Sequence, residues 1–269
     1  GVTLLNSPCF HYFASGANCV VTDITIQSPS GAHDSPLGWV APNTDGIDIA
    51  CNGGYVARNR VVNGDDSLCV KSPGSNILFE DNYIEQGNGI VIGTSDNVDI
   101  HNITYRNTTA NRTAYGAHIK YACCSNPSVK DCHLRHCSRV CVPLLSVILL
   151  AGRFKFDQVG SVSRVVFENI TVIDPYRYVI GIDQDDQTVS EPTHPQPLKS
   201  IVEGPLANVS ISDVTFRNIR TDGQVKQAGV FVCDFRRHGA EDGPKGPPCI
   251  YSDEQSADTH SHNHYTVYY

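Results

Sequence analysis

The chain has 269 residues, 40% of them hydrophobic, with a formal net charge of -8 and a sequence pI near 5.7. The acidic balance disfavours nucleic acid, and the longest apolar run, residues 140–151, is shorter than the ~20 residues of a membrane helix. We therefore expect one domain with no nucleic-acid partner and no membrane span. Eleven cysteines and five N-x-S/T sequons indicate a secreted, extracellular glycoprotein.

Short β-branched runs that contain Asn recur along the chain, at 18–26, 76–84, 97–105, 164–172 and 208–216. Each alternates apolar and polar residues at the period of two that is typical of half-buried strands. Asn76 and Asn97 are 21 residues apart, and a strand that begins near residue 54 precedes Asn76 by 22. A repeat of this length predicts an all-β parallel β-helix; a β-sandwich, the alternative, favours strands every ~8–12 residues. Residue 1 opens directly onto strand-like sequence, so we expect a secretion signal and further rungs upstream.

Two segments lack the strand pattern and bound the expected β-helix domain, 1–252. Residues 123–162 carry five of the eleven cysteines and predict an irregular insertion, and residues 253–269 predict an irregular tail. The insertion admits three interpretations: a disulfide-tied or disordered loop, non-coding sequence retained in a gene model, or a zinc site. The zinc hypothesis would use Cys132, His133, His136, Cys137 and Cys141, although their spacing matches no familiar finger.

Acidic residues recur at nearly the length of one rung. Asp45 and Asp65 are 20 residues apart, and Asp66 follows directly. Adjacent parallel rungs stack ~4.8 Å apart, so the predicted coil brings these carboxylates together. Crowded carboxylates cannot all ionise freely, so one keeps its proton and can act as a general acid while the others stay charged. Glycoside hydrolysis requires such a pair.

The polar column continues beyond the aspartates. Asn88 lies 22 residues after Asp66 between two glycines, which permit a tight corner or a close approach to a ligand. His118 and Lys120 follow after one rung and a loop, and Lys120 suits an acidic sugar. Asn, Asp and Gly are also the usual residues of β-turns, so it is the coincidence of these segments on one face that favours a binding site.

The motifs NTDGID, GDDSLCVK, GNGIVIG and HIK, in this order and spacing, resemble the four signature segments of glycoside hydrolase family 28, the polygalacturonase and rhamnogalacturonase family. Those segments are commonly NTD, GDD, GHG and RIK, and the resemblance covers residues 2–121 and 164–234. It implies a single-stranded right-handed parallel β-helix of the pectin-lyase-like type. It also implies a monomer that hydrolyses α-linked residues of a pectic polysaccharide with inversion, without metal or cofactor.

By motif position, the resemblance implies that Asp65 is the general acid, and that Asp45 and Asp66 hold and deprotonate the attacking water. Inverting enzymes separate the acid and base carboxyl groups by ~6.5–9.5 Å to admit that water. Asn88, His118 and Lys120 would bind substrate. Asn88 stands where the family usually has His, and His118 stands where it has Arg.

These departures remove a titratable group and a bidentate carboxylate ligand. We therefore expect an altered preference, for rhamnogalacturonan, for xylogalacturonan or for exo-action on galacturonan.

Two other functions compete with hydrolysis. The insertion after Lys120 motivates a catalytically inactive carbohydrate-binding β-helix or a defective gene product, and the fold is shared with calcium-dependent pectate-lyase-like eliminases. Two disulfides are candidates, Cys9 with Cys19 and Cys233 with Cys249.

Overall fold

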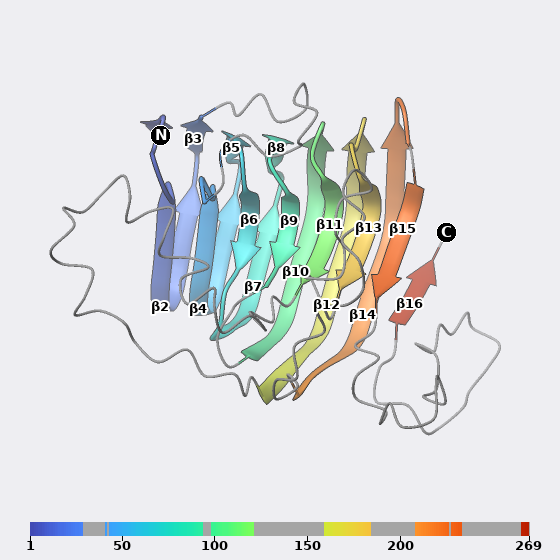
Figure 1. Ribbon diagram of the computed structural model, residues 1–269. Helices are drawn as coiled ribbons and strands as arrows, with labels where there is room; N and C mark the ends of the chain where they lie inside the picture. The colour runs from blue at the N-terminus through green and yellow to red at the C-terminus, as the bar shows by residue number, and fades with distance from the viewer. Residues whose placement is uncertain are drawn as a thin grey trace, which may run out of the picture.

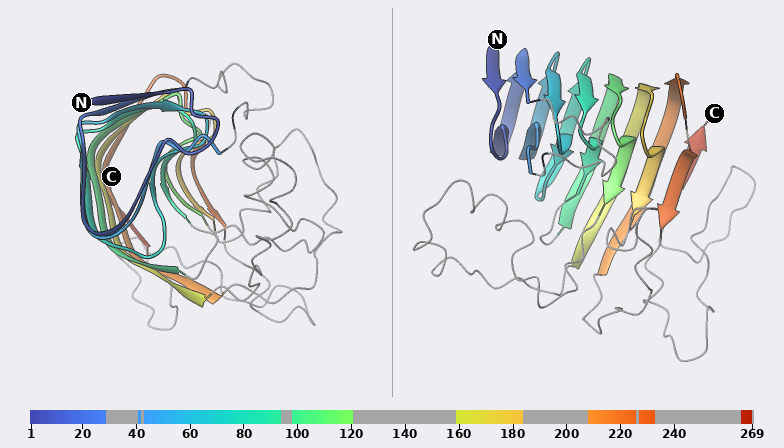
Figure 2. Two further views of the ribbon diagram at one scale, coloured as in Figure 1. Left: turned by 90° about the vertical axis from the view of Figure 1, so that its left-hand side faces the viewer. Right: turned by 45° about the horizontal axis from the view of Figure 1, so that its top comes forward.

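The computed structural model describes residues 1–28, 41, 43–93, 98–120, 159–183, 208–225, 227–232 and 265–268. These residues form a right-handed parallel β-helix, as predicted, in which 16 strands make one continuous sheet and every described pairing is parallel (Figure 1). Successive rungs superimpose when the coil is viewed end-on (Figure 2, left). Within these ranges no helix has the length and apolarity needed to cross a membrane.

The strands form three columns. The first contains β1 (Val2–Leu5), β3 (Ile24–Gln27), β5 (Arg60–Asn63) and β8 (Tyr83–Gln86). The second contains β2 (Tyr12–Thr22), β4 (Ile47–Ala57), β7 (Gly74–Glu80), β10 (Val98–Asn111), β12 (Val159–Ile173), β14 (Asn208–Asp222) and β16 (Tyr265–Tyr268). The third, here called the site column, contains β6 (Asp66–Val70), β9 (Gly89–Ile92), β11 (Tyr115–Lys120), β13 (Tyr178–Asp183) and β15 (Gln227–Val232), beside the start of β4.

The predicted rung length holds from β4 to β9 in the site column, but it fails between β9 and β11, where Ile90 pairs with Ala117, 27 residues later, and in the second column. Ile47 pairs with Leu68, and Leu68 pairs with Ile90, at the expected spacing of 21 to 22 residues. In the second column, Asn76 lies over Asn102, 26 residues later, rather than over Asn97. The longer rung includes residues 94–97, which lie outside the described residues.

Left-handed backbone conformations explain the recurrent Asn and Asp. On six successive rungs the chain turns at a residue with φ between 52° and 61°, namely Asp23, Arg58, Asp81, Asn107, Asn169 and Asn218. Asn and Asp tolerate this region better than other residues with a Cβ atom. The asparagine side chains also bond from rung to rung, since the amide of Asn169 donates to Asn107 at 3.2 Å and that of Asn218 to Asn169 at 3.1 Å.

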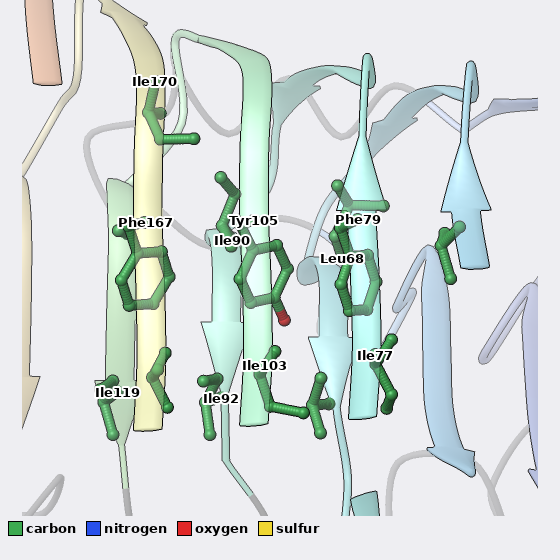
Figure 3. Close-up of a cluster of buried hydrophobic side chains, with 14 of the residues drawn as sticks. Leu68, Ile77, Phe79, Ile90, Ile92, Ile103, Tyr105, Ile119, Phe167 and Ile170 are labelled. Carbon is green, nitrogen blue, oxygen red and sulfur yellow. The ribbon is translucent and has the colours of Figure 1, made fainter. Parts of the chain in front are cut away.

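The core consists of side chains at equivalent positions of successive rungs, which stack on one another. Phe79, Tyr105, Phe167 and Phe216 are fully buried, and their rings stack with centroids 4.3, 5.3 and 5.0 Å apart. The first three rings and the aliphatic side chains around them are visible in Figure 3. The hydroxyl of Tyr105 donates to the carbonyl of Val91 at 3.1 Å, so its buried polar atom is satisfied.

Three expectations need correction. Residues 159–162, which we expected in the insertion, begin β12 and pair with β10, because their alternating sequence fits a strand. Tyr265–Tyr268, expected in the irregular tail, form β16 beside β14, since the aromatic and β-branched residues suit a strand. Cys19 bonds to Cys51 on the next rung rather than to Cys9. The proposed zinc residues and the pair Cys233–Cys249 lie outside the described residues.

Phe167→Ala should destabilise the protein, because it opens a cavity between two stacked rings. We expect the free energy of unfolding to fall by about 3–5 kcal/mol, measured by guanidinium denaturation. Phe13→Ala is the matched control, since Phe13 is 57% exposed and its loss should change stability by less than about 0.5 kcal/mol. Equal losses in the two variants would contradict this account of the core.

Candidate active site

A β-bulge determines the direction of the Asp66 side chain, the second aspartate of the GDD motif. Asp66 and Leu68 are two residues apart, a spacing that in a regular strand puts both side chains on one face. The register between β6 and β9 shifts here, because Asp66 pairs with Gly89 and Leu68 with Ile90, so that Ser67 is the additional residue. The bulge allows Leu68 to pack in the core while the Asp66 carboxylate contacts two lysine side chains on the opposite face.

The turn that carries the two adjacent aspartates is fixed by Asn63, whose side chain is fully buried. The amide nitrogen of Asn63 lies 2.9 Å from the carbonyl oxygens of Thr44 and Asp65 and 3.0 Å from that of Asp66. Thr44 belongs to the preceding rung. Asn63 therefore ties the turn of Asp45 to the turn of Asp65 and Asp66.

The three predicted catalytic aspartates meet beside the first residues of β4 and β6 in the site column. Asp45, Asp65 and Asp66 are 4%, 9% and 2% exposed, and one carboxylate oxygen of each lies within 4.8 Å of the others. This spacing is shorter than the ~6.5–9.5 Å between carboxyl groups that we expected for an inverting enzyme. The aspartates converge as the sequence predicted, but their separation does not by itself indicate inversion.

Two lysines neutralise part of this negative charge. The Nζ atom of Lys120 lies 2.8 Å from Oδ1 of Asp66, as expected for a residue of the same column. The Nζ atom of Lys71 lies 3.2 Å from Oδ2 of Asp45 and 3.7 Å from Oδ2 of Asp66. The lysines therefore hold Asp66 from both sides.

Asn88 contacts the carboxylates directly. Its side-chain amide donates to Asp65 at 2.8 Å and to Asp66 at 3.0 Å, and its backbone N–H donates to the Asp65 carbonyl at 2.8 Å. The flanking Gly87 and Gly89 have φ values of 61° and 97°, so the predicted tight corner is present. Asn88 thus orients the two aspartates, and the substrate binding that we expected of it stays a prediction.

Burial and charge separate the pKa values of the aspartates. Burial, followed by the charges of Asp66 and Asp45, raises the pKa of Asp65 to about 7. Burial and the charge of Asp48 raise the pKa of Asp45 to about 8. Burial also opposes ionisation of Asp66, but Lys120 and Lys71 outweigh it and hold its pKa well below the usual range. Asp66 is therefore the charged carboxylate of the group, while Asp45 and Asp65 retain protons near neutral pH.

His118 is a neutral ring in the wall of the site. It is 2% exposed, stacks on Tyr115 with centroids 3.8 Å apart, and neither ring nitrogen has a hydrogen-bond partner among the described residues. Burial, followed by the charge of Lys120, lowers the pKa of His118 to about 3. His118 therefore provides neither the charge nor the fork of the arginine that the family has at this position.

The carboxylate group could geometrically surround a cation. Among the described residues, Asp45, Asp65 and Asp66 are the group of side chains whose donor atoms lie close enough together for this. Lys71 and Lys120 already place ammonium groups against these oxygens. A metal ion there would have to displace these ammonium groups, so the donor set does not suit a dedicated metal site.

Sequence reasoning missed two residues of the site. Asp48 lies 1% exposed on β4, and Lys71 follows the end of β6. The Nζ atom of Lys71 lies 3.7 Å from Oδ1 of Asp48, and this oxygen accepts no hydrogen bond from any residue that the structure describes. The pairing register is the signal that could have found them. Ile49 pairs with Val70 and both side chains lie in the core, so the adjacent Asp48 and Lys71 side chains lie on the opposite face, with the site.

Comparison with known proteins agrees with this geometry. The family described as "Glycosyl hydrolases family 28" matches residues 1–137. A polygalacturonase of Penicillium janthinellum is 27% identical over 235 residues, which cover 86% of this chain and 50% of that protein. Endopolygalacturonase B of Aspergillus niger is 26% identical over 238 residues, which cover 86% of this chain and 51% of that protein. The chain spans about half the length of the curated relatives that it matches.

Solved structures share the fold. Endopolygalacturonase I from Stereum purpureum, in complex with two galacturonate, matches with a TM-score of 0.55 and 21% identity over 86% of this chain and 63% of that chain. An endo-xylogalacturonan hydrolase from Aspergillus tubingensis matches with a TM-score of 0.54 and 15% identity over 93% of this chain and 63% of that chain. At these identities the likeness establishes the parallel β-helix alone.

The buried neutral His118 should make the protein less stable in acid. Its pKa is lower in the folded state than in the unfolded state, so the unfolded chain binds the proton first and stability is lost as the pH falls below about 6.5. Between pH 7 and pH 5 we expect His118→Phe to lose about 2 kcal/mol less unfolding free energy than the unchanged protein. Urea denaturation at the two pH values measures this difference, and parallel losses would contradict a neutral His118.

Proposed function

The chain belongs to glycosyl hydrolase family 28, and from this premise we propose that it hydrolyses α-glycosidic bonds of a pectic polysaccharide. The observation that carries the proposal is the difference in protonation within one group of carboxylates. Asp65 retains a proton near neutral pH, whereas Asp66, within 4.8 Å, stays charged. An acid beside a base is the requirement of glycoside hydrolysis.

In the proposed reaction, Asp65 donates its proton to the glycosidic oxygen as the bond from this oxygen to the anomeric carbon breaks. A water molecule attacks the anomeric carbon and gives its proton to Asp66, and Asp45 helps to hold the water. Two saturated products leave, and one of them carries a new reducing end. Asn88 keeps Asp65 and Asp66 in place through hydrogen bonds of 2.8 and 3.0 Å.

The charge of the site supports a substrate with uronic acid residues. The chain is acidic overall, with a formal net charge of -8, so it attracts a polyanion only through locally placed cations. Lys120, whose side chain is 19% exposed, is the candidate for such a cation, whereas Lys71 faces three carboxylates of the protein. His118 is neutral, so we propose that this subsite does not bind a uronate carboxylate as a bidentate arginine would, which leaves a rhamnogalacturonan, a xylogalacturonan or the end of a galacturonan chain as the candidate substrates.

We infer that the protein acts outside the cell, as a monomer. The disulfide between Cys19 and Cys51 supports the extracellular location, because such bonds persist in oxidising compartments.

A carbohydrate-binding protein without catalysis is the second candidate. The 4.8 Å spacing of the carboxylates favours it, because an attacking water needs room between acid and base.

Asp65→Asn should abolish most of the activity, because Asn keeps the shape of the acid but cannot donate its proton to the leaving oxygen. We expect kcat to fall by about 10²–10⁴-fold. The assay follows new reducing ends on polygalacturonate, rhamnogalacturonan and xylogalacturonan, with absorbance of unsaturated products recorded in parallel. Binding of the same polysaccharides by the variant, measured by affinity electrophoresis, should persist. Unsaturated products would indicate elimination, and binding without cleavage by the unchanged protein would establish the second candidate.

The anomer that forms first distinguishes inversion from retention, the two mechanisms that the carboxylate spacing leaves open. Family membership leads us to expect inversion at the anomeric carbon, whereas carboxyl groups ~5–5.5 Å apart are typical of retaining enzymes. Proton NMR of the reaction, recorded before mutarotation, identifies the anomer that forms first. Retention would contradict the proposed role of Asp66 as a base that activates water.

A further inference from the structure

Lys71 occupies the centre of the negative charge in the site. Its ammonium nitrogen lies 3.2 Å from Asp45, 3.7 Å from Asp48 and 3.7 Å from Asp66. Its side chain is only 21% exposed, whereas the three carboxylate side chains are 5%, 2% and 3% exposed. Water therefore screens these contacts weakly, and the ammonium charge acts on all three carboxylates at once.

Within the described part of the chain, Lys71 supplies one of the two positive charges that face the carboxylates of the site. Four buried carboxylates, those of Asp45, Asp48, Asp65 and Asp66, face two ammonium groups. Lys120 bonds to Oδ1 of Asp66, whereas Lys71 faces Oδ2 of the same residue together with Asp45 and Asp48.

Three other described side chains of the site add no charge to this balance. The Cys69 thiol, 3.7 Å from Oδ2 of Asp66, stays neutral because burial raises its pKa. Asn88 is uncharged, and His118 is a neutral ring. Removal of the Lys71 ammonium would therefore leave one cation against four carboxylates.

We propose that Lys71 is a positioning residue of the reaction, because its ammonium is the shared counter-ion of Asp45, Asp48 and Asp66 and, together with Lys120, sets the lowest pH at which the base is free of its proton. The inference rests on the proposed function. Lys71 acts through the carboxylates, and the reaction does not require it to touch the sugar.

The backbone around Lys71 is fixed independently of its side chain. The N–H of Lys71 donates to the carbonyl of Ile49 at 2.9 Å, which continues the hydrogen bonding between β4 and β6. On the next rung, Gly93 leaves space for the second lysine, since a Cβ atom there would lie 2.8 Å from Cγ of Lys120. The two ammonium groups can therefore converge on Asp66, and substitution of the Lys71 side chain leaves the strand pairing intact.

Lys71→Met tests the proposal because Met keeps much of the length and apolar stem of Lys without its charge. An opposite charge within ~4–6 Å lowers the pKa of a carboxyl by about 1–3 units, so its loss should move the acidic limb of the kcat/KM profile upward by at least about one pH unit. Lys71→Arg keeps the charge and should retain the profile of the unchanged protein. A lower kcat with an unmoved acidic limb would overturn the proposal and leave Lys71 with a packing role.

Asp48→Asn supplies a test of opposite sign. Loss of this carboxylate frees the Lys71 charge for Asp45 and Asp66, so the single variant should move the acidic limb downward. Combined with Lys71→Met it removes one negative and one positive charge, and we expect the double variant to recover at least half of the upward shift. A packing defect in Lys71→Met would not be repaired by the isosteric change Asp48→Asn. If neither the downward shift of the single variant nor the recovery in the double variant is observed, the proposal is overturned.

A spectroscopic titration separates failure of this inference from failure of the proposed function. ¹³C NMR of proteins with labelled aspartate carboxyl groups reports protonation without any substrate. Lys71→Met should raise, and Asp48→Asn lower, the pH at which the buried carboxyl resonances of the site titrate. If these shifts occur in a protein that cleaves no pectic polysaccharide, the counter-ion role stands and the hydrolytic function falls. If the resonances do not move, the counter-ion role is wrong whatever the activity.

Discussion

The structure depends on the in-register hydrogen bonding of one rung to the next. Each rung repeats the same path, so a side chain is placed over its equivalent at the separation of neighbouring parallel strands, ~4.8 Å. Asp45 and Asp66 meet for this reason, since the N–H of Gly46 donates to the carbonyl of Asp66 at 2.7 Å. The same constraint carries Lys120 to Asp66 across 54 residues of sequence. The backbone ladder thus converts periodicity in the sequence into a cluster of charges.

Crowding of these charges has an electrostatic consequence. A buried carboxylate is costly unless it is paired or protonated, and the site contains more carboxylates than cations. The lysines stabilise the ionised form of Asp66, and the uncompensated remainder is accommodated by protons on Asp45 and Asp65. The division into acid and base therefore follows from where the two ammonium groups lie. It does not follow from the chemical identity of the aspartates, which is the same.

Small departures from the regular coil determine how these charged side chains are placed. The β-bulge at Ser67 separates the directions of Asp66 and Leu68, which regular alternation would put on one face. Asn88 stands where the family usually has a titratable histidine, and its amide binds both carboxylates. The site therefore varies the usual family pattern at Asn88 and His118 while keeping the three aspartates.

The sequence by itself determined the parallel β-helix, the family and the convergence of Asp45, Asp65 and Asp66. Strand alternation, recurrent Asn at left-handed corners and the order of four motifs are local or periodic signals, and these survive in a linear chain. It did not determine the 26-residue spacing of Asn76 and Asn102, the Cys19–Cys51 bond, or the tasks of Asn88, His118 and Lys71. Those depend on register, on a one-residue bulge and on burial, which exist only once the rungs have stacked. Lys71 is the plainest case: it ends the motif GDDSLCVK, but its place beside three carboxylates follows from the pairing of β4 with β6.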